Sequence, residues 1–232
     1  MFNIQVNKDA YKQESVSNSS SNVITKSGFY DITLDSVALR KTSTNNPYIH
    51  IRYRKGVDNK EGNVGHFFLW LVNKDGTESF DKKTFMDLMV VLGIDKLDKT
   101  EPREIQYKEG TKTLDCYKEF DNKVVHLYAR QTFYLNGKKE VQEKFDRLTF
   151  FDKDKKTAFE IINGSEPKRY EKLSSNPDSL KANYSNGCTI EQAEAYKASF
   201  SSNKEAGGGV NPNTPKPSFL SSLDGENDEL PF

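Results

Sequence analysis

The sequence has few cysteines and no long apolar run, and each shortage excludes a class of protein. Cys116 and Cys188 are the only cysteines among 232 residues, and neither has a cysteine or histidine neighbour at zinc-ligand spacing. Isolated thiols exclude a disulfide framework and a zinc cluster, and they predict a reducing, cytoplasmic environment. No apolar run approaches the roughly 20 residues that a spanning helix needs, and residues 1–5 lack a signal-peptide pattern. We therefore expect no membrane association.

The motifs of the common enzyme classes are also missing. The sequence contains no glycine-rich phosphate loop, no nucleophile elbow and no paired histidines at metal-ligand spacing. Carboxylates are plentiful, but none falls in an apolar setting that would mark it as catalytic. We expect a protein that is not an enzyme and that uses no metal or other cofactor.

Charge is unevenly distributed along the chain although the net charge is zero. From Ser201 onward two lysines oppose five carboxylates, so this end carries a net charge of −3 and the remainder a net charge of +3. Such asymmetry is expected when a basic body carries an acidic arm.

Alternating apolar residues predict the first strand, which begins at Gly28. Tyr30, Ile32 and Leu34 alternate with polar residues, and the alternation resumes one position out of phase after them. A phase slip within one strand indicates a bulge, which we expect near residues 35–36.

The next two strands have two different faces, because successive side chains of a strand point to opposite sides. In the strand after Pro47 the apolar set is Ile49, Ile51 and Tyr53, and the opposite set is Tyr48, His50, Arg52 and Arg54. In residues 64–72 the apolar set is Phe67, Leu69 and Leu71, and the opposite set is His66, Phe68 and Trp70. The apolar sets predict a core, and the opposite sets combine stacking rings with cations.

One helix and two further strands complete the predicted domain. Apolar residues spaced from Phe85 to Leu92 predict a helix, with Asp81 as its N-cap and Gly93 just past its end. Residues 123–135 and 141–151 are strongly β, and the dipeptide Asn136-Gly137 predicts a hairpin between them. A change of parity near Phe145 indicates a second bulge.

Five strands with one helix between the third and fourth match the OB-fold, so we predict a mainly β, five-stranded barrel with disordered termini. The predicted organisation is a flexible lead-in over residues 1–27, the barrel over 28–162, an extension with a short helix over 163–206, and a flexible linker and acidic tail over 207–232. A capping box at Thr189 and Gln192 marks the start of the short helix.

Rings and cations on one sheet face predict sequence-tolerant capture of single-stranded nucleic acid, because every base can stack and every phosphate carries a charge. The candidate DNA-binding residues are Tyr48, His50, Arg52, Arg54, Phe68, Trp70, Tyr128 and Arg130.

The end of the chain is an acidic run followed by an apolar hook. Its candidate partner-binding residues are Asp224, Glu226, Asp228, Glu229, Leu230, Pro231 and Phe232. An acidic segment this polar should stay disordered until a partner captures it, with the terminal ring in an apolar pocket and a basic rim around the carboxylate.

This tail resembles those of bacterial and phage single-stranded-DNA-binding proteins, and the body resembles a phage protein of this family with an OB-fold. The resemblance rests on the Gly28-Phe-Tyr strand, the Asn46-Pro47 turn, the helix ending at Leu92-Gly93 and the final hairpin. It implies coating of DNA during replication, recombination or repair, a tail that recruits replication or recombination proteins, and the host cytoplasm for a phage-encoded chain. Residues 94–122 and 163–200 are additions to the better-known bacterial type, and they leave the oligomeric state open.

Two other interpretations stay open at this stage. Phe68 and Trp70 could be buried beneath residues 163–200, which would leave only a solvated sheet surface. Alternatively, the chain could be a protein-interaction or virion-assembly module in which the tail works and the barrel is a scaffold. Salt-sensitive binding of single strands would separate these interpretations from DNA binding.

Overall fold

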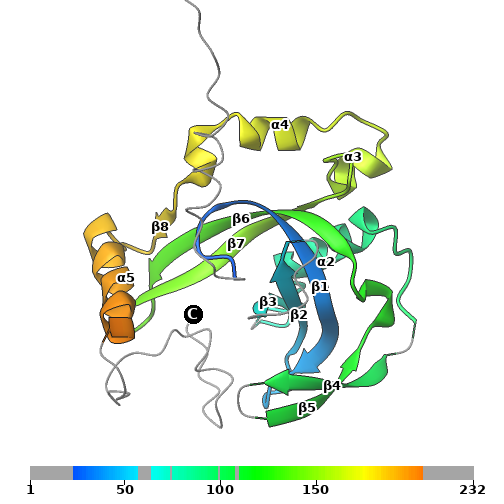
Figure 1. Cartoon of the computed structure of the whole chain (residues 1–232), viewed down its shortest axis with the longest axis horizontal. Helices are drawn as coiled ribbons and strands as arrows, with labels where there is room; N and C mark the ends of the chain where they lie inside the picture. Colours follow the sequence, from blue (N-terminus) through cyan, green and yellow to red (C-terminus); the bar gives the residue numbers. More distant parts are fainter. Residues whose placement is uncertain (1–22, 57–63, 74, 99, 108–109, 206–232) are drawn as a thin grey trace, which may run out of the picture.

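The computed structural model describes residues 23–56, 64–73, 75–98, 100–107 and 110–205 (Figure 1). Most of the expected lead-in and the whole linker and acidic tail, from Asp224 to Phe232, lie outside these ranges. Residues 23–27, at the end of the expected lead-in, pack against the sheet. Ile24 is 2% exposed, and its N–H donates to the hydroxyl of Tyr53 at 3.3 Å. An apolar side chain and a satisfied buried amide hold this segment in place.

The fold is mainly β. Its strands are β1 (Gly28–Lys41), β2 (Pro47–Lys55), β3 (Gly65–Trp70), β4 (Glu101–Tyr107), β5 (Gly110–Cys116), β6 (Val124–Leu135), β7 (Val141–Phe151) and β8 (Asn183–Ser185). Its helices are α2 (Phe80–Val91), η1 (Lys118–Phe120), α3 (Ala158–Ile162), α4 (Lys168–Ser174), η2 (Pro177–Leu180) and α5 (Ile190–Glu205).

The strands form one eight-stranded sheet, in which one path runs β3-β2-β1-β5-β4 and β6 pairs with β1, β7 and β8. The prediction of a mainly β fold is confirmed, but a five-stranded barrel is not. Three further strands belong to the sheet, and no ladder joins β3 to β7 among the described residues. Within residues 94–122, which the resemblance marked as an addition to the bacterial type, β4 and β5 pair antiparallel, and we call this pair the β4–β5 hairpin (Figure 1).

A bulge in β1 lets this strand serve two neighbours along one edge. The β1–β2 register shifts between Leu34 and Ser36, which confirms the predicted bulge. Before the bulge, residues 28–33 pair with β6, and after it Ala38 pairs with Cys116 of β5. The predicted second bulge is also confirmed, because the β6–β7 register shifts between Tyr128 and Arg130.

Helix α2 contacts both β3 and β7 and covers the space between them. Its buried side includes Phe85 and Leu88, which belong to the main apolar cluster. The N-cap is Ser79 and not Asp81, whose carboxylate instead accepts a hydrogen bond from the N–H of Trp70 at 3.1 Å. The helix ends as expected at Gly93, which has a φ of +66° in a Schellman arrangement.

The predicted hairpin after β6 is present, although Gly137 does not take the left-handed conformation. Lys139 does so, with a φ of +60°, and the N–H of Asn136 donates to the carbonyl of Glu140. The loop is therefore longer than the two-residue turn for which Asn-Gly is best known.

Strand β8 and helix α5 tie the described part of the extension, residues 163–205, to the sheet. Strand β8 pairs in parallel with β6, and α4, β8 and α5 lie along the side formed by β6 and β7 (Figure 1). The predicted capping box is confirmed. The backbone N–H of Thr189 donates to the side-chain oxygen of Gln192, and the backbone N–H of Gln192 donates to the hydroxyl of Thr189. A small cluster of Phe133, Cys188 and Ala193 fixes α5 to the sheet.

Gly65 should be intolerant of a side chain, because it lies beneath the buried ring of its cross-strand partner Tyr53. A Cβ at this position would stand 2.2 Å from Cζ of Tyr53. We expect Gly65→Ala to lower the free energy of unfolding by about 1 to 3 kcal/mol, the usual cost of overpacking, as measured by urea denaturation. Gly28→Ala is the matched control, since its nearest contact would be 3.4 Å. Equal stability of the two variants would contradict this packing.

Candidate nucleic-acid interface

The side of β1, β2 and β3 that points away from the main apolar cluster continues over β5 and β4, and we call it the outer face. Part of this face is not exposed, because Ala38, Cys116, Leu114 and Ile105 form a second buried apolar cluster. Residues that pair directly across antiparallel strands point to the same side. The register of the sheet therefore places the following residues on this face: Trp70, Phe68 and His66 of β3, Tyr48, His50 and Arg52 of β2, Arg40, Ala38 and Ser36 of β1, Cys116, Leu114 and Lys112 of β5, and Arg103, Ile105 and Tyr107 of β4.

A row of five rings crosses this face from β3 to β2. The ring centroids of Tyr48 lie 5.0 Å from Trp70 and 5.9 Å from Phe68. His50 stacks on Phe68 at 4.8 Å and on His66 at 5.1 Å. The rings of β3 are half-buried, whereas Tyr48 and His50 are only 8% and 1% exposed. The rings that a base can reach are thus those of β3, and the rings of β2 support them from below.

His50 and His66 form a neutral pair inside this row. Their facing nitrogens, Nε2 of His50 and Nδ1 of His66, are 2.8 Å apart, so one ring donates and the other accepts. Burial, the neighbouring His66 and the guanidinium groups of Arg40 and Arg52 lower the pKa of His50 to about 2. Burial and Arg52 lower the pKa of His66 to about 4, against a smaller opposing effect of Asp35. Neither histidine contributes positive charge near neutral pH.

The cations of the outer face lie over its rings. The guanidinium carbon of Arg40 is 5.9 Å from the ring of Tyr48, and that of Arg52 is 5.2 Å from the ring of Tyr107. Lys112 approaches the same Tyr107 ring at 5.5 Å. The β4–β5 hairpin therefore forms a second wall beside β2. Sequence reasoning missed Arg40, Tyr107 and Lys112, although the parity after the β1 bulge already places Arg40 opposite the core.

Asp35, the bulge residue, holds the two arginines of β2. Its carboxylate pairs with Arg54 through a hydrogen bond and with Arg52 at 3.6 Å. The side chains of Asp35 and Arg52 are 13% and 8% exposed, so this pairing satisfies charges that are largely removed from water. The bulge carbonyl also accepts from Arg103 of β4 at 3.2 Å, which ties the hairpin to β1.

Three buried polar atoms of the outer face have no hydrogen-bond partner within the described part of the chain. They are Nδ1 of His50, Nε of Arg52 and the hydroxyl of Tyr107. Buried polar atoms are normally satisfied, so these three are exceptions to the usual pairing of buried polar groups.

Tyr128 and Arg130, which we predicted as DNA-binding residues, do not join the outer face. Tyr128 pairs with Phe29 at one end of β1, whereas Tyr48 pairs with Arg40 at the other end. Tyr128 is 3% exposed, and its hydroxyl donates to the carbonyl of Ser179 in η2 at 2.9 Å. Parity alone put Tyr128 opposite the core, but the extension covers that side of β6. The remaining six candidates lie together on β2 and β3.

Among the described residues, no three histidine, cysteine, aspartate or glutamate side chains are grouped so that they could hold a metal ion. Cys116 and Cys188 are both buried free thiols. The described part also contains no helix of the length and apolarity that crossing a membrane requires.

Comparison with protein-family models gave no match, and comparison with curated proteins gave no significant relative.

The neutral histidine pair should make stability depend on pH. Because both pKa values lie below the ordinary 6.5, the folded state binds protons less tightly than the unfolded chain. Stability is full above about pH 6.5 and falls as the pH drops toward 4, by on the order of 1 kcal/mol per pH unit for each ring. Urea denaturation at about pH 7 and about pH 5 measures this loss.

His66→Gln should reduce the loss between the two pH values, whereas His126→Gln, which leaves the pair intact, should retain it. If the free energy of unfolding fell by the same amount in His66→Gln and in the wild-type protein, the histidine pair would not be the cause of the pH dependence.

Proposed function

We propose that this protein binds single-stranded DNA, without sequence preference, through the outer face of β1, β2 and β3 and the β4–β5 hairpin. The observation that carries the proposal is the row of five rings, with half-buried Phe68 and Trp70 at its accessible edge and cations beside it. Stacking of a base on such a ring contributes roughly 1 to 3 kcal/mol and tolerates every base.

The charges beside the row support backbone contacts of moderate strength. Arg40 and Lys112 flank the rings, whereas Arg52 and Arg54 share the carboxylate of Asp35. A phosphate that approaches the β2 arginines competes with Asp35, so stacking supplies the larger share of the affinity. The remaining phosphate contacts release counterions and make binding sensitive to salt.

The chain order supports an open OB-like arrangement for this role. Strands β3, β2, β1, β6 and β7 neighbour one another in that order, and α2 lies between β3 and β6 in the sequence. Instead of a direct β3–β7 ladder, α2 contacts both strands. The outer face then corresponds to the surface of the second and third strands, where OB-folds bind oligonucleotides.

For the acidic tail we propose recruitment of replication or recombination proteins, with Leu230, Pro231 and Phe232 as the anchor. This part of the proposal rests on the sequence, where four carboxylates precede a terminal aromatic residue.

A protein-interaction module is the second candidate. Tyr48, His50 and Arg52 are each less than 9% exposed, so little of their surface is open to direct contact with DNA. Elsewhere Phe80 of α2 and Phe159 of α3 are 72% and 70% exposed, as apolar anchors for a protein partner would be.

Titration of Trp70 fluorescence with a single-stranded oligonucleotide tests the proposal, because Trp70 is the sole tryptophan and lies at the accessible edge of the row. We expect strong quenching that weakens as salt is added, since bases stack while phosphates displace counterions.

Phe68→Ala should weaken binding by about 1 to 3 kcal/mol, and Phe159→Ala on α3 is the matched control that should leave it unchanged. Absence of quenching and of a gel shift at every salt concentration would favour the interaction module.

A further inference from the structure

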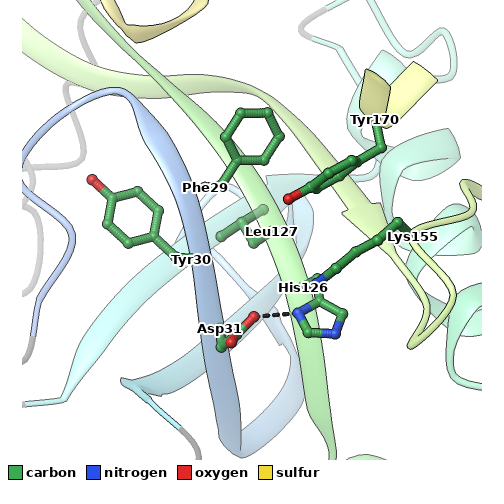
Figure 2. Close-up of a pocket in the computed structure, with 7 residues that line it drawn as sticks. All are labelled: Phe29, Tyr30, Asp31, His126, Leu127, Lys155 and Tyr170. Atoms are coloured by element: carbon green, nitrogen blue, oxygen red, sulfur yellow. Dashed lines mark hydrogen bonds and ion pairs between the residues drawn. The ribbon is translucent and has the colours of Figure 1, made fainter. Parts of the chain in front are cut away.

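A small hollow lies beside the outer face, between β1, β6, the turn that follows β7, and α4 (Figure 2). Its volume is about 220 Å³, and we call it the cleft. The residues that line it are Phe29, Tyr30, Asp31, His126, Leu127, Lys155 and Tyr170.

Aromatic packing fixes one wall of the cleft. The ring of Tyr170 lies 5.0 Å from Phe29 and meets Phe151 edge-on at 5.4 Å, with an interplanar angle of 88°. The ring is thereby held against the sheet, and its hydroxyl points into the cleft above Leu127 (Figure 2). The wall offers an apolar surface with one hydroxyl in a fixed place.

Cationic and polar groups converge from the other side. Lys155 lies 5.5 Å from the Tyr170 ring and extends toward His126, whose Nδ1 bonds to Asp31 (Figure 2). Lys155 occupies a turn with a φ of +63°, closed by the carboxylate of Asp152, which accepts from the amide of Lys156 at 2.8 Å. An ordered turn thus presents the ammonium group beside an apolar wall.

The cleft and the outer face lie on the same side of β1. Because the bulge shifts the alternation by one residue, Asp31 and Thr33 before it point to the same side of β1 as Ser36 and Ala38 after it. Arg54 pairs with Thr33 and lies between the cleft and the outer face. From Asp31 to Ala38 the strand rises roughly 23 Å at about 3.3 Å per residue. A single strand several nucleotides long can span this interval, which is within the footprint of about 4 to 16 nucleotides known for one OB-fold.

We propose that the cleft binds one further nucleotide unit of the DNA strand that occupies the outer face. The phosphate contacts the Lys155 ammonium and the Tyr170 hydroxyl, and the sugar or base lies on Phe29. This inference rests on the proposed function, and it makes the binding footprint longer than the outer face alone. A free nucleotide also carries an anionic phosphate next to a base, so it could occupy the same cleft.

Length-dependent binding tests the cleft. Oligonucleotides of about 4 and about 16 nucleotides, the two ends of the known range for one OB-fold, are titrated against the full chain. Trp70 quenching reports the outer face, and fluorescence anisotropy of labelled DNA reports overall affinity. The variants are Lys155→Asn, which suits the left-handed backbone, and Tyr170→Phe, which keeps the ring and removes the hydroxyl. Lys153→Gln, an exposed lysine of the same turn that does not line the cleft, is the control.

We expect Lys155→Asn to weaken binding of the long oligonucleotide roughly five- to tenfold and to lower the salt slope by about one. Tyr170→Phe should weaken it less. Affinity for the short oligonucleotide and its quenching of Trp70 should be unchanged in both variants. Urea denaturation checks that each variant is folded.

The outcomes separate the two proposals. If Lys155→Asn and Lys153→Gln bind the long oligonucleotide with equal affinity, the cleft site is wrong and the proposed function stands. If the wild-type protein does not bind DNA at all, the proposed function is wrong and the cleft site with it. Calorimetry with deoxyadenosine monophosphate distinguishes the strand from a free nucleotide. Saturable binding of the monophosphate, as tight as that of the long oligonucleotide, would overturn the assignment to DNA.

Discussion

The bulge at Asp35 is the constraint on which the rest of the structure depends. A regular strand presents one edge to one neighbour, but β1 turns at the bulge and pairs first with β6 and then with β5. The same residue supplies the carboxylate that holds Arg52 and Arg54 and the carbonyl that binds Arg103. Bending of the sheet, orientation of the β2 arginines and attachment of the β4–β5 hairpin therefore have one origin.

This arrangement favours stacking over charge on the outer face. The histidines are neutral because burial and nearby guanidinium groups lower their pKa values, so they act as rings and hydrogen-bonding groups. Arg52 and Arg54 are already paired with Asp35, and Arg103 is paired with Asp121. Arg40 and Lys112 lie over tyrosine rings. The proposed ligand, a flexible single strand, suits such a surface better than a duplex does, because the bases of the single strand are free to stack on the rings whereas those of the duplex are covered.

Local patterns in the sequence predicted the elements that depend on parity and on turns. The core positions Ile49, Ile51 and Tyr53, both bulges, the cap glycine Gly93 just past the end of α2 and the capping box at Thr189 follow from period-two alternation and from capping chemistry. Five of the eight candidate DNA-binding residues belong to the outer face for the same reason, and Arg54 lies beside it.

The remaining features depend on contacts between distant segments, which parity does not contain. Tyr128 has the expected orientation, but η2 covers it. The β4–β5 hairpin escaped prediction because its strands are highly charged, with Ile105 and Leu114 among their few apolar residues. Asp81 looked like a helix cap, yet its carboxylate binds the amide of Trp70 in the neighbouring strand. For Tyr128 and Asp81 a tertiary partner decided the outcome.

Photo-crosslinking followed by peptide mapping tests the central claim most directly. An oligonucleotide that carries a photoreactive thymine analogue reacts with the side chains nearest its bases. The outer face predicts crosslinks in the peptides that contain Phe68 and Trp70 of β3 and Tyr107 of β4. Crosslinks confined to α5 or to the exposed residues of α3, with none on β3 or β4, would contradict it.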